Sequence, residues 1–257
     1  MLGIGYSVEG GVARIVISRE DFYNAFNSGM WADFSSSVRT ACSSPEVFAL
    51  VVEARGRWFS VGYDVEELLG IETVEASRRY FQGVRRAFTR LLECRKPVIA
   101  AVQGPALSAG AELLLASDVV IASRSASVGF PDARLGLIPP VLSTLGIYIL
   151  GYRRAKAMAM TGAVLAASEA RDVGLVDLVV DPDIIGGAVR ETVEYVRRSP
   201  QTSLGSIKEA VTASVRPALE AAYSKLELMV LSREARERMR RCLESGCRIP
   251  GLGELPR

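Results

Sequence analysis

The chain has 257 residues, of which 49% are hydrophobic, and a formal net charge of +2. This composition is ample for a packed core, and the near-neutral charge gives no long-range field that would attract nucleic acid. The sequence contains no histidine. Ser-His-Asp and Cys-His catalysis are therefore excluded, and any acid–base chemistry falls to carboxylates, Lys, Tyr or Cys.

Cysteine usage and apolar segments bear on the compartment of the protein. The four cysteines form no C-x-x-C pair, so a zinc site is not expected. Cys242 and Cys247 could form a local disulfide, but we expect all four to be buried or unreactive thiols.

The first residues, MLGIGYSVEGG, lack the basic and apolar parts of a signal peptide. The apolar run 97–123 carries Gln103 and Glu112 and favours strand, turn, helix and strand over a membrane span. We expect a cytoplasmic protein with no membrane partner.

The elements expected in the first two thirds of the chain alternate between strand and helix. β-branched runs at 12–18 and 47–54 predict strands, with a helix between them that begins near Ser28. Residues 97–104 predict a buried strand that leads into a helix. Further strands are expected at 119–123 and 175–180. This alternation indicates an α/β protein.

The pattern changes after Asp183, from where long helical segments continue to about Gly246. We divide the chain into a core over residues 1–195 and a C-terminal helical lobe over residues 196–257. The pattern alone leaves open whether this lobe packs against a neighbouring subunit or on its own domain.

The stretch QGPALSAGAELLLASD (103–118) places one carboxylate, Glu112, in an otherwise apolar helix. A charge in a dry core needs a partner or a function. A capping box, in which Glu or Gln stands three residues after the N-cap Ser or Thr, does not explain Glu112. The third residue after Ser108 is Ala111, so Glu112 comes one position too late. One interpretation is an unidentified cation. The other is that the first N–H groups of this helix bind a ligand oxygen, with Glu112 one turn after Ala109 and beside that oxygen.

Two further stretches fit the second interpretation. RWFSVGYDVEEL (57–68) predicts a strand end, a glycine turn and a helix that starts at Asp64. By itself this is an ordinary turn, but two backbone N–H donors that converge on one carbonyl oxygen form an oxyanion hole. VGFPDARLGLIPP (128–140) places Asp132 in a loop 20 residues beyond Glu112. By itself, Asp132 is equally well a turn or cap residue.

In this order, these stretches resemble the enoyl-CoA hydratase/isomerase (crotonase) family. The quoted motifs are DFYNAFN, FSVGYD, VQGPALSAGAELLLASD, FPDARLGLIP and MAMTGAVLAASEARDVGLVDLVV. The resemblance implies an α/β fold, a crotonase-like spiral of ββα units with a C-terminal all-helical oligomerisation lobe. It also implies a homotrimer or a dimer of trimers that acts on an acyl-CoA or enoyl-CoA thioester. No metal or other cofactor is implied, since coenzyme A enters as part of the substrate.

The resemblance also assigns site residues. It places the catalytic carboxylates at Glu112 and Asp132, and the oxyanion N–H groups on Tyr63 and Ala109. The positions that the resemblance implies for substrate binding are Tyr23, Ala25, Ser60, Val61, Gly62, Asp64 and Gly110.

The chain departs from the family pattern at three points. The usual glycine triplet is Ser108-Ala109-Gly110, Gln103 replaces the usual Asn, and the second carboxylate is Asp132 where a typical hydratase has Glu. The sequence predicts an enoyl-CoA hydratase. The alternatives are a double-bond isomerase or another acyl-CoA lyase of the family, and a catalytically silent member that binds acyl-CoA or RNA. The arginine-rich segment 78–96 keeps the RNA alternative open, although no nucleic-acid partner is expected.

Overall fold

The computed structural model describes residues 3–245, 248–249 and 253–254, and its centre is a six-stranded sheet with the order β1-β2-β3-β4-β6-β9. β1 and β2 pair antiparallel, and every later neighbour in this sheet pairs parallel. The strands of this sheet are β1 (Gly3–Glu9), β2 (Val12–Ser18), β3 (Ala49–Ala54), β4 (Val98–Val102), β6 (Val119–Ser123) and β9 (Leu178–Val180). A smaller sheet contains β5 (Ala106–Leu107), β7 (Ser127–Gly129) and β8 (Val164–Ala166). A short hairpin contains β10 (Arg248–Ile249) and β11 (Gly253–Glu254).

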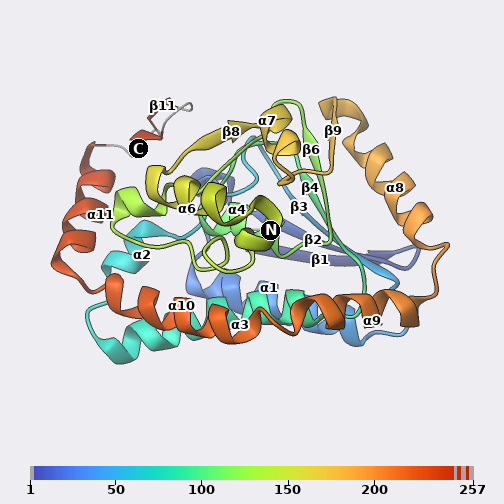
Figure 1. Cartoon of the computed structure of the whole chain (residues 1–257), viewed down its shortest axis with the longest axis horizontal. Coiled ribbons are helices and arrows are strands. Elements are labelled where there is room, and N and C mark those ends of the chain that lie inside the picture. Colours follow the sequence, from blue (N-terminus) through green and yellow to red (C-terminus); the bar gives the residue numbers. More distant parts are fainter. Residues whose placement is uncertain (1–2, 246–247, 250–252, 255–257) are drawn as a thin grey trace.

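Helices surround these sheets, as Figure 1 shows. The α-helices are α1 (Ser28–Ser43), α2 (Val65–Leu69), α3 (Val74–Glu93), α4 (Ala109–Leu115), α5 (Gly146–Leu150), α6 (Tyr152–Thr161), α7 (Ala167–Asp172), α8 (Ile185–Val196), α9 (Gln201–Thr212), α10 (Arg216–Met229) and α11 (Arg233–Ser245). The short 3-10 helices are η1 (Glu20–Phe22), η2 (Pro131–Leu135) and η3 (Pro182–Ile184). The alternation of strands and helices predicted from the sequence is confirmed.

The large sheet separates two hydrophobic cores, because successive residues of a strand point to opposite faces. In β3, Leu50 and Val52 enter the main core, whereas Ala49 and Val51 enter the smaller one. The smaller core is closed by α8, which lies at the right-hand end of Figure 1. Burial on both faces explains why β3 and β4 are continuous apolar runs in the sequence.

Local signals in the sequence set several boundaries. The strands predicted at 12–18 and 119–123 match β2 and β6, and α1 begins at Ser28 as expected. The side chain of Asn27 caps α1 by accepting a hydrogen bond from the N–H of Met30 at 2.9 Å. The apolar run 97–123 folds as β4, β5, α4 and β6, and within the described residues no helix is long and apolar enough to span a bilayer.

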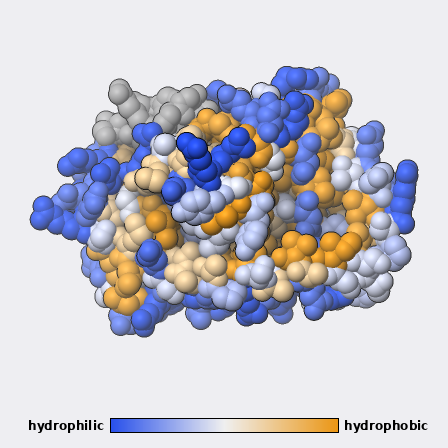
Figure 2. Space-filling model, viewed as in Figure 1, coloured by the Kyte–Doolittle hydropathy of each residue, from blue (hydrophilic) through white to orange (hydrophobic). Residues whose placement is uncertain are grey.

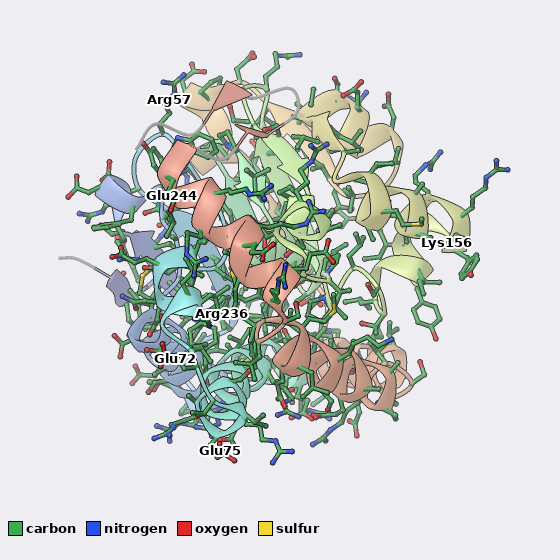
Figure 3. All side chains as sticks on the ribbon, turned by 90° about the vertical axis from the view of Figure 1, so that its left-hand side faces the viewer. Arg57, Glu72, Glu75, Lys156, Arg236 and Glu244 are labelled. Atoms are coloured by element: carbon green, nitrogen blue, oxygen red, sulfur yellow. A yellow bond between two sulfur atoms is a disulfide. The ribbon has the colours of Figure 1, made fainter. Side chains whose placement is uncertain are left out.

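The C-terminal helices pack on their own domain. Arg85 of α3 forms ion pairs with Glu220 at 2.5 Å and with Glu227 at 3.0 Å, both on α10. α11, at the left of Figure 1, contacts α2 and η2. Figure 3 faces this side of the molecule and labels Arg236 on α11, which donates a hydrogen bond to the carbonyl of Ile71 at 2.7 Å. Of the two placements that the sequence left open, the structure shows contact within the chain.

The expectation of four unpaired thiols is wrong. A disulfide joins Cys42, near the end of α1, to Cys94, just after α3, with their Cα atoms 5.6 Å apart. The two cysteines are separated by 52 residues and meet only because α1 and α3 pack side by side, which no local pattern reveals. Cys242 is also disulfide-bonded. The alternative local pair needs Cys247, which lies outside the described residues.

Large hydrophobic side chains are exposed on α5 and α6. Tyr148, Tyr152 and Met160 are 70%, 64% and 72% exposed. On the face drawn in Figure 2, hydrophobic residues form several patches that are separated by charged ones. Scattered exposed apolar residues are normal, and these three lie on two consecutive helices.

Candidate active site

Glu112 is fully buried on α4, and it is held by backbone groups rather than by a cation. Its Oε1 accepts hydrogen bonds from the N–H groups of Val141 at 2.6 Å and Leu142 at 3.0 Å. Its Oε2 has no hydrogen-bond partner among the described residues. One oxygen therefore fixes the carboxyl group, and the other remains available for a reacting molecule. The interpretation of Glu112 as the partner of an unidentified cation is not supported.

Asp132 supplies a second buried carboxyl group next to the first. It lies on η2, where Pro131 occupies the first turn. Its Oδ1 accepts a hydrogen bond from the hydroxyl of Ser108 at 2.6 Å, and its Oδ2 has no partner within the described part of the chain. Ser108 directly precedes α4, so this bond ties the Asp132 segment to the helix that carries Glu112. The structure thus brings the two predicted carboxylates together.

Burial sets the protonation of this pair. Desolvation, followed by the neighbouring charge of Asp132, raises the pKa of Glu112 well above its ordinary value, against the two backbone hydrogen bonds that lower it. Desolvation raises the pKa of Asp132 to about 6, although the hydroxyl of Ser108 opposes this rise. Both shifts favour the protonated form, and two carboxyl groups this close titrate as a pair rather than independently.

The turn that carries Tyr63 lies directly against the start of α4. Phe26 donates its N–H to the carbonyl of Gly62 at 2.7 Å and accepts the N–H of Asp64 at 3.0 Å. The N–H of Tyr63, between them, must then point away from Phe26, since alternate groups in an extended segment face opposite sides. A Cβ atom on Gly62 would lie 2.9 Å from the backbone nitrogen of Ala109, and Gly62 has φ +96°. Only glycine permits this approach.

Two backbone donors are consequently free at this contact. Neither the N–H of Tyr63 nor that of Ala109 takes part in a backbone hydrogen bond among residues 3–245. Ala109 is the first residue of α4, where helix geometry leaves the N–H unpaired and at the positive end of the helix dipole. Two such donors beside two buried carboxyl groups form an arrangement that stabilises negative charge on a carbonyl oxygen and moves protons next to it.

Known proteins are similar to this chain in sequence. The family model "Enoyl-CoA hydratase/isomerase" matches residues 7–246. The chain belongs to this family. It is 31% identical to the 1,2-epoxyphenylacetyl-CoA isomerase of Escherichia coli (strain K12), over 80% of each chain. It is 30% identical to the short-chain-enoyl-CoA hydratase of Clostridium acetobutylicum, over 84% of this chain and 83% of that protein.

Solved structures agree on the architecture. A crystal structure of an enoyl-CoA hydratase/isomerase from Xanthobacter autotrophicus Py2 superposes with a TM-score of 0.84 at 27% identity, over 94% of this chain and 93% of that chain. One of an enoyl-CoA hydratase from Mycobacterium avium subsp. paratuberculosis K-10 also gives 0.84, at 25% identity, over 95% and 96% of the two chains. The fold is that of the crotonases, as the sequence predicted.

The other substrate-binding positions implied by the crotonase resemblance lie around the Tyr63 turn. Ser60 is buried, and its hydroxyl donates to the carbonyl of Asn24 at 2.8 Å and accepts the N–H of Gly62 at 3.0 Å. The N–H of Val61 donates to the carbonyl of Tyr23 at 3.2 Å. These bonds fasten the early loop to the glycine turn, so Ser60, Val61 and Tyr23 position the backbone of the site.

Gly110 and Asp64 have structural tasks as well. A Cβ atom on Gly110 would lie 2.6 Å from the carbonyl oxygen of Ser60, so α4 approaches the turn closely only because residue 110 is glycine. The carboxylate of Asp64 caps α2 and accepts a hydrogen bond from Arg19 at 2.6 Å. Arg19 also donates to the carbonyl of Ala25 at 3.0 Å, which fixes the remaining predicted position.

Sequence reasoning missed four participants. Ser108 was identified only as a departure from the usual glycine triplet, yet its hydroxyl holds Asp132. That departure was the available signal, and in the structure Ser108 has a φ of +52°, which non-glycine residues rarely adopt. Asn24, with its side-chain amide bonded to the carbonyls of Arg55 and Trp58, was a second omission. The N–H groups of Val141 and Leu142 gave no signal in the sequence, because every residue except proline carries a backbone N–H.

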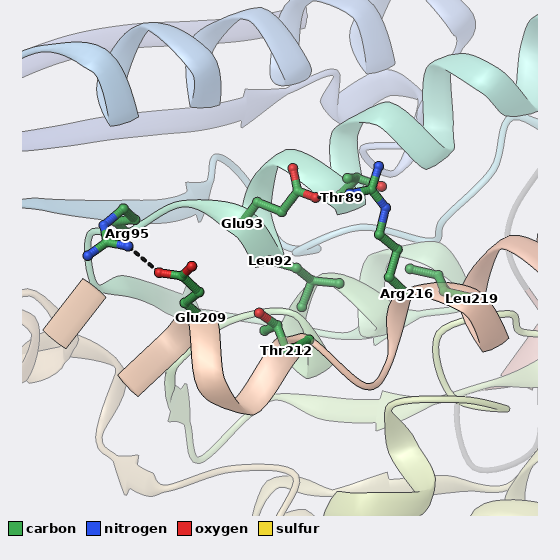
Figure 4. A pocket seen from close by; sticks show the side chains of 9 residues that line it. Thr89, Leu92, Glu93, Arg95, Glu209, Thr212, Arg216 and Leu219 are labelled. Atoms are coloured by element: carbon green, nitrogen blue, oxygen red, sulfur yellow. Dashed lines mark hydrogen bonds and ion pairs between the residues drawn. The ribbon is translucent and has the colours of Figure 1, made fainter. Parts of the chain in front are cut away.

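A pocket of about 440 Å³ lies away from these carboxyl groups, between the end of α3 and the α9–α10 segment (Figure 4). Its charged side chains are already paired: Arg95 with Glu209, and Arg216 with Glu93 at 2.9 Å. The charges that line this pocket therefore have no free partner for a ligand. The carboxyl pair and the free N–H groups remain the candidate active site of this crotonase.

Proposed function

We propose that this protein is an enoyl-CoA hydratase, which adds water across the α,β double bond of an enoyl-CoA thioester. The observation that supports this proposal is a pair of buried carboxyl groups, each fixed through one oxygen and free at the other, beside two free backbone N–H groups. Hydration needs one group to deprotonate water and another to protonate carbon, and it needs a site for the enolate oxygen.

The enolate sets the electrostatic demand. As water attacks the β-carbon, negative charge develops on the thioester oxygen. In this proposal the N–H groups of Tyr63 and Ala109 bind that oxygen, and one such donor contributes roughly 3 kcal/mol to transition-state stabilisation. Because α4 begins at Ala109, its helix dipole adds to the same effect.

The carboxyl pair supplies the acid and the base. In the assignment implied by the family resemblance, Oε2 of Glu112 orients and deprotonates the water, and Asp132 protonates the α-carbon. Burial raises the pKa of both groups, which favours a pair that carries a proton for transfer to carbon. In the exchanged assignment, Asp132 deprotonates the water and Glu112 protonates the α-carbon.

Two measurements in heavy water test the proposal and separate these assignments. In the first, crotonyl-CoA and longer enoyl-CoA thioesters are incubated with the protein, and mass spectrometry detects the hydrated product with deuterium at the α-carbon. In the second, exchange of the α-hydrogens of butyryl-CoA is followed in Asp132→Asn and Glu112→Gln. If Asp132 faces the α-carbon, only Asp132→Asn loses exchange, and the reverse result exchanges the roles. A protein that hydrates none of the thioesters would refute hydratase activity.

Double-bond isomerisation is the second candidate, supported by the family description, which includes enoyl-CoA isomerases. Moving a double bond requires only one carboxyl group to shuttle a proton, so Asp132→Asn would leave turnover largely intact. A product of unchanged mass with a shifted double bond identifies this reaction. The RNA-binding alternative has less support, because two arginines of the basic helix are occupied: Arg85 pairs with Glu220 and Glu227, and Arg90 donates to Ser35.

The proposed assembly is a homotrimer or a dimer of trimers in the cytoplasm. The exposed apolar side chains of α5 and α6 provide a surface that such an assembly could cover. Light scattering on the intact chain tests the assembly directly. The Cys42–Cys94 disulfide restricts the organisms for which a cytoplasmic location fits. Structural disulfides persist in the cytosol mainly in hyperthermophiles, so the proposed location fits a hyperthermophilic source best.

A further inference from the structure

Two tyrosine hydroxyls lie buried near the carboxyl pair without a hydrogen-bond partner among the described residues. They belong to Tyr63, whose backbone N–H is one of the free donors, and to Tyr223 of α10. Tyr63 is 4% exposed and Tyr223 is fully buried. The free oxygens of Glu112 and Asp132 are unpartnered in the same way. Buried polar groups are nearly always bonded, so these four atoms need partners that the described part of the chain does not supply.

The two phenol rings are firmly placed by their surroundings. The ring of Tyr63 packs edge-on against Phe81 at 5.9 Å between centroids and lies 6.2 Å from Trp31. The ring of Tyr223 lies 6.4 Å from Phe88. The three rings that contact them belong to α1 and α3, so helices hold both phenol rings in place, although Tyr63 itself lies in a turn.

Tyr223 is also fixed along the sequence. It lies three residues after Glu220 and four before Glu227, so the three side chains share one face of α10. Arg85 binds both glutamates, and the hydroxyl of Ser77 donates to the carbonyl of Glu227 at 2.6 Å. These contacts dock α10 on α3. They bury Tyr223 in the aromatic cluster that also holds Tyr63, through Phe88 and Trp31, whose ring centroids are 5.7 Å apart.

Both phenols act as neutral hydrogen-bond donors. Burial, followed by the neighbouring Glu112 carboxyl, raises the pKa of Tyr63 well above its ordinary value, and the same two causes raise that of Tyr223. A phenylalanine at either position would fill the same apolar space without leaving a donor unpaired.

We propose that Tyr63 and Tyr223 bind an oxygen atom on the acyl chain, so that the preferred substrates are acyl-CoA thioesters whose acyl group carries a hydroxyl or carbonyl beyond the β-carbon. This inference rests on the proposed acyl-CoA activity and adds the substrate class to it. A site built around hydrogen bonds to a substrate oxygen discriminates strongly against an analogue that lacks it, because the buried donors are then left unpaired.

The test measures binding, so that it does not depend on the reaction. Affinities of hexanoyl-CoA and of its analogues with a hydroxyl on each carbon beyond the β-carbon are measured by calorimetry. The wild-type protein is expected to bind at least one hydroxylated analogue about tenfold or more tightly than hexanoyl-CoA. Tyr63→Phe and Tyr223→Phe should each reduce this preference by about three- to tenfold, the range of one neutral hydrogen bond. Affinity for hexanoyl-CoA should stay unchanged or improve.

Tyr80→Phe is the matched control, because Tyr80 is a buried tyrosine whose hydroxyl already donates to the carbonyl of Phe26 at 3.3 Å. It should lower thermal stability and leave the preference unaltered, whereas Tyr63→Phe and Tyr223→Phe should leave stability unchanged or raise it. Equal binding of all the thioesters by the wild-type protein would overturn the proposal. So would an unaltered preference in both variants, or a loss of stability in them that matches Tyr80→Phe. Failure of hydration with the preference intact would refute the proposed reaction and leave this inference standing.

Discussion

Two regions of the molecule hold charged side chains against the core, and the hydrogen-bonding state of those charges differs between them. Between α3 and α10, Arg85 is bonded to two glutamates, and the ion pairs there hold the C-terminal helices on the core. Around α4, Glu112 and Asp132 are two acids side by side, each with an unpartnered oxygen. The first arrangement satisfies its charges and stabilises the fold. The second leaves polar atoms unsatisfied, which natural proteins tolerate mainly where function requires it.

The comparison predicts that changes at the carboxyl pair affect turnover and changes between α3 and α10 affect stability. Glu112→Gln should give the largest effect. It keeps the shape and an oxygen for the N–H groups of Val141 and Leu142, but it removes the titrating group, so turnover should fall by roughly a hundredfold to ten-thousandfold. The free energy of unfolding at neutral pH should stay the same or rise, because a neutral amide replaces a group whose ionisation burial disfavours.

Steady-state turnover of an enoyl-CoA and urea unfolding of the same preparation check this prediction. Retained turnover would mean that Glu112 has a structural role and not a catalytic one. The carboxyl pair would then not differ in kind from the ion pairs between α3 and α10.

Cys42→Ser should give the largest loss of stability. The Cys42–Cys94 disulfide closes a long loop, and its removal should lower the free energy of unfolding by about 2–4 kcal/mol. Turnover per folded molecule should not change, since the bond lies at the ends of α1 and α3. Denaturant unfolding with and without reductant measures the effect. Cys94→Ser should give the same loss, and the double variant no more than either; additive losses would contradict a single shared bond.

Arg85→Met should destabilise the protein by about 1–3 kcal/mol. Removing Arg85 leaves Glu227, 9% exposed, without its cation, and partial exposure of the Arg85 side chain, 24%, keeps the effect below that of a fully buried pair. Arg238→Met is the control, because Arg238 pairs with Glu234 on the exposed side of α11 and should matter by less than about 0.5 kcal/mol. Thermal unfolding of the two variants tests this prediction. Equal shifts of the unfolding temperature would mean that the α3–α10 ion pairs contribute no more to stability than a surface pair.

The smallest effect concerns pH. The proposed reaction needs one proton on the carboxyl pair. Activity should therefore fall on the acid side as Asp132 becomes protonated, with half the maximal rate near its pKa of about 6. The hydroxyl of Ser108 favours the ionised form of Asp132, so Ser108→Ala should raise that pKa and move the acid limb to higher pH. Profiles of kcat/KM against pH for the two proteins measure this. If the acid limb of the kcat/KM profile lies at the same pH in both proteins, the hydroxyl of Ser108 does not influence the pKa of Asp132.

Much of the fold was readable from local signals. β2 and β6 were predicted with their observed bounds, and Ser28 as the start of α1, because alternating or continuous apolar patterns and cap residues act over a few residues. The carboxylates and the glycine turn were found through their order along the chain and through the family resemblance. The Cys42–Cys94 bond was not found, since nothing near either cysteine specifies which helix will lie beside it.

The residue types of the active site can be read from the chain: two carboxyl groups, two turns that expose N–H groups, and no histidine to share the proton transfer. The behaviour of those groups depends on the folded structure. Folding buries Glu112 against the backbone of Val141 and Leu142, joins Ser108 to Asp132, and packs Tyr223 of α10 into the aromatic cluster of Tyr63. The physical reason is that pKa values and free hydrogen-bonding atoms depend on distance and solvent exclusion in space, and segments far apart in the chain set both.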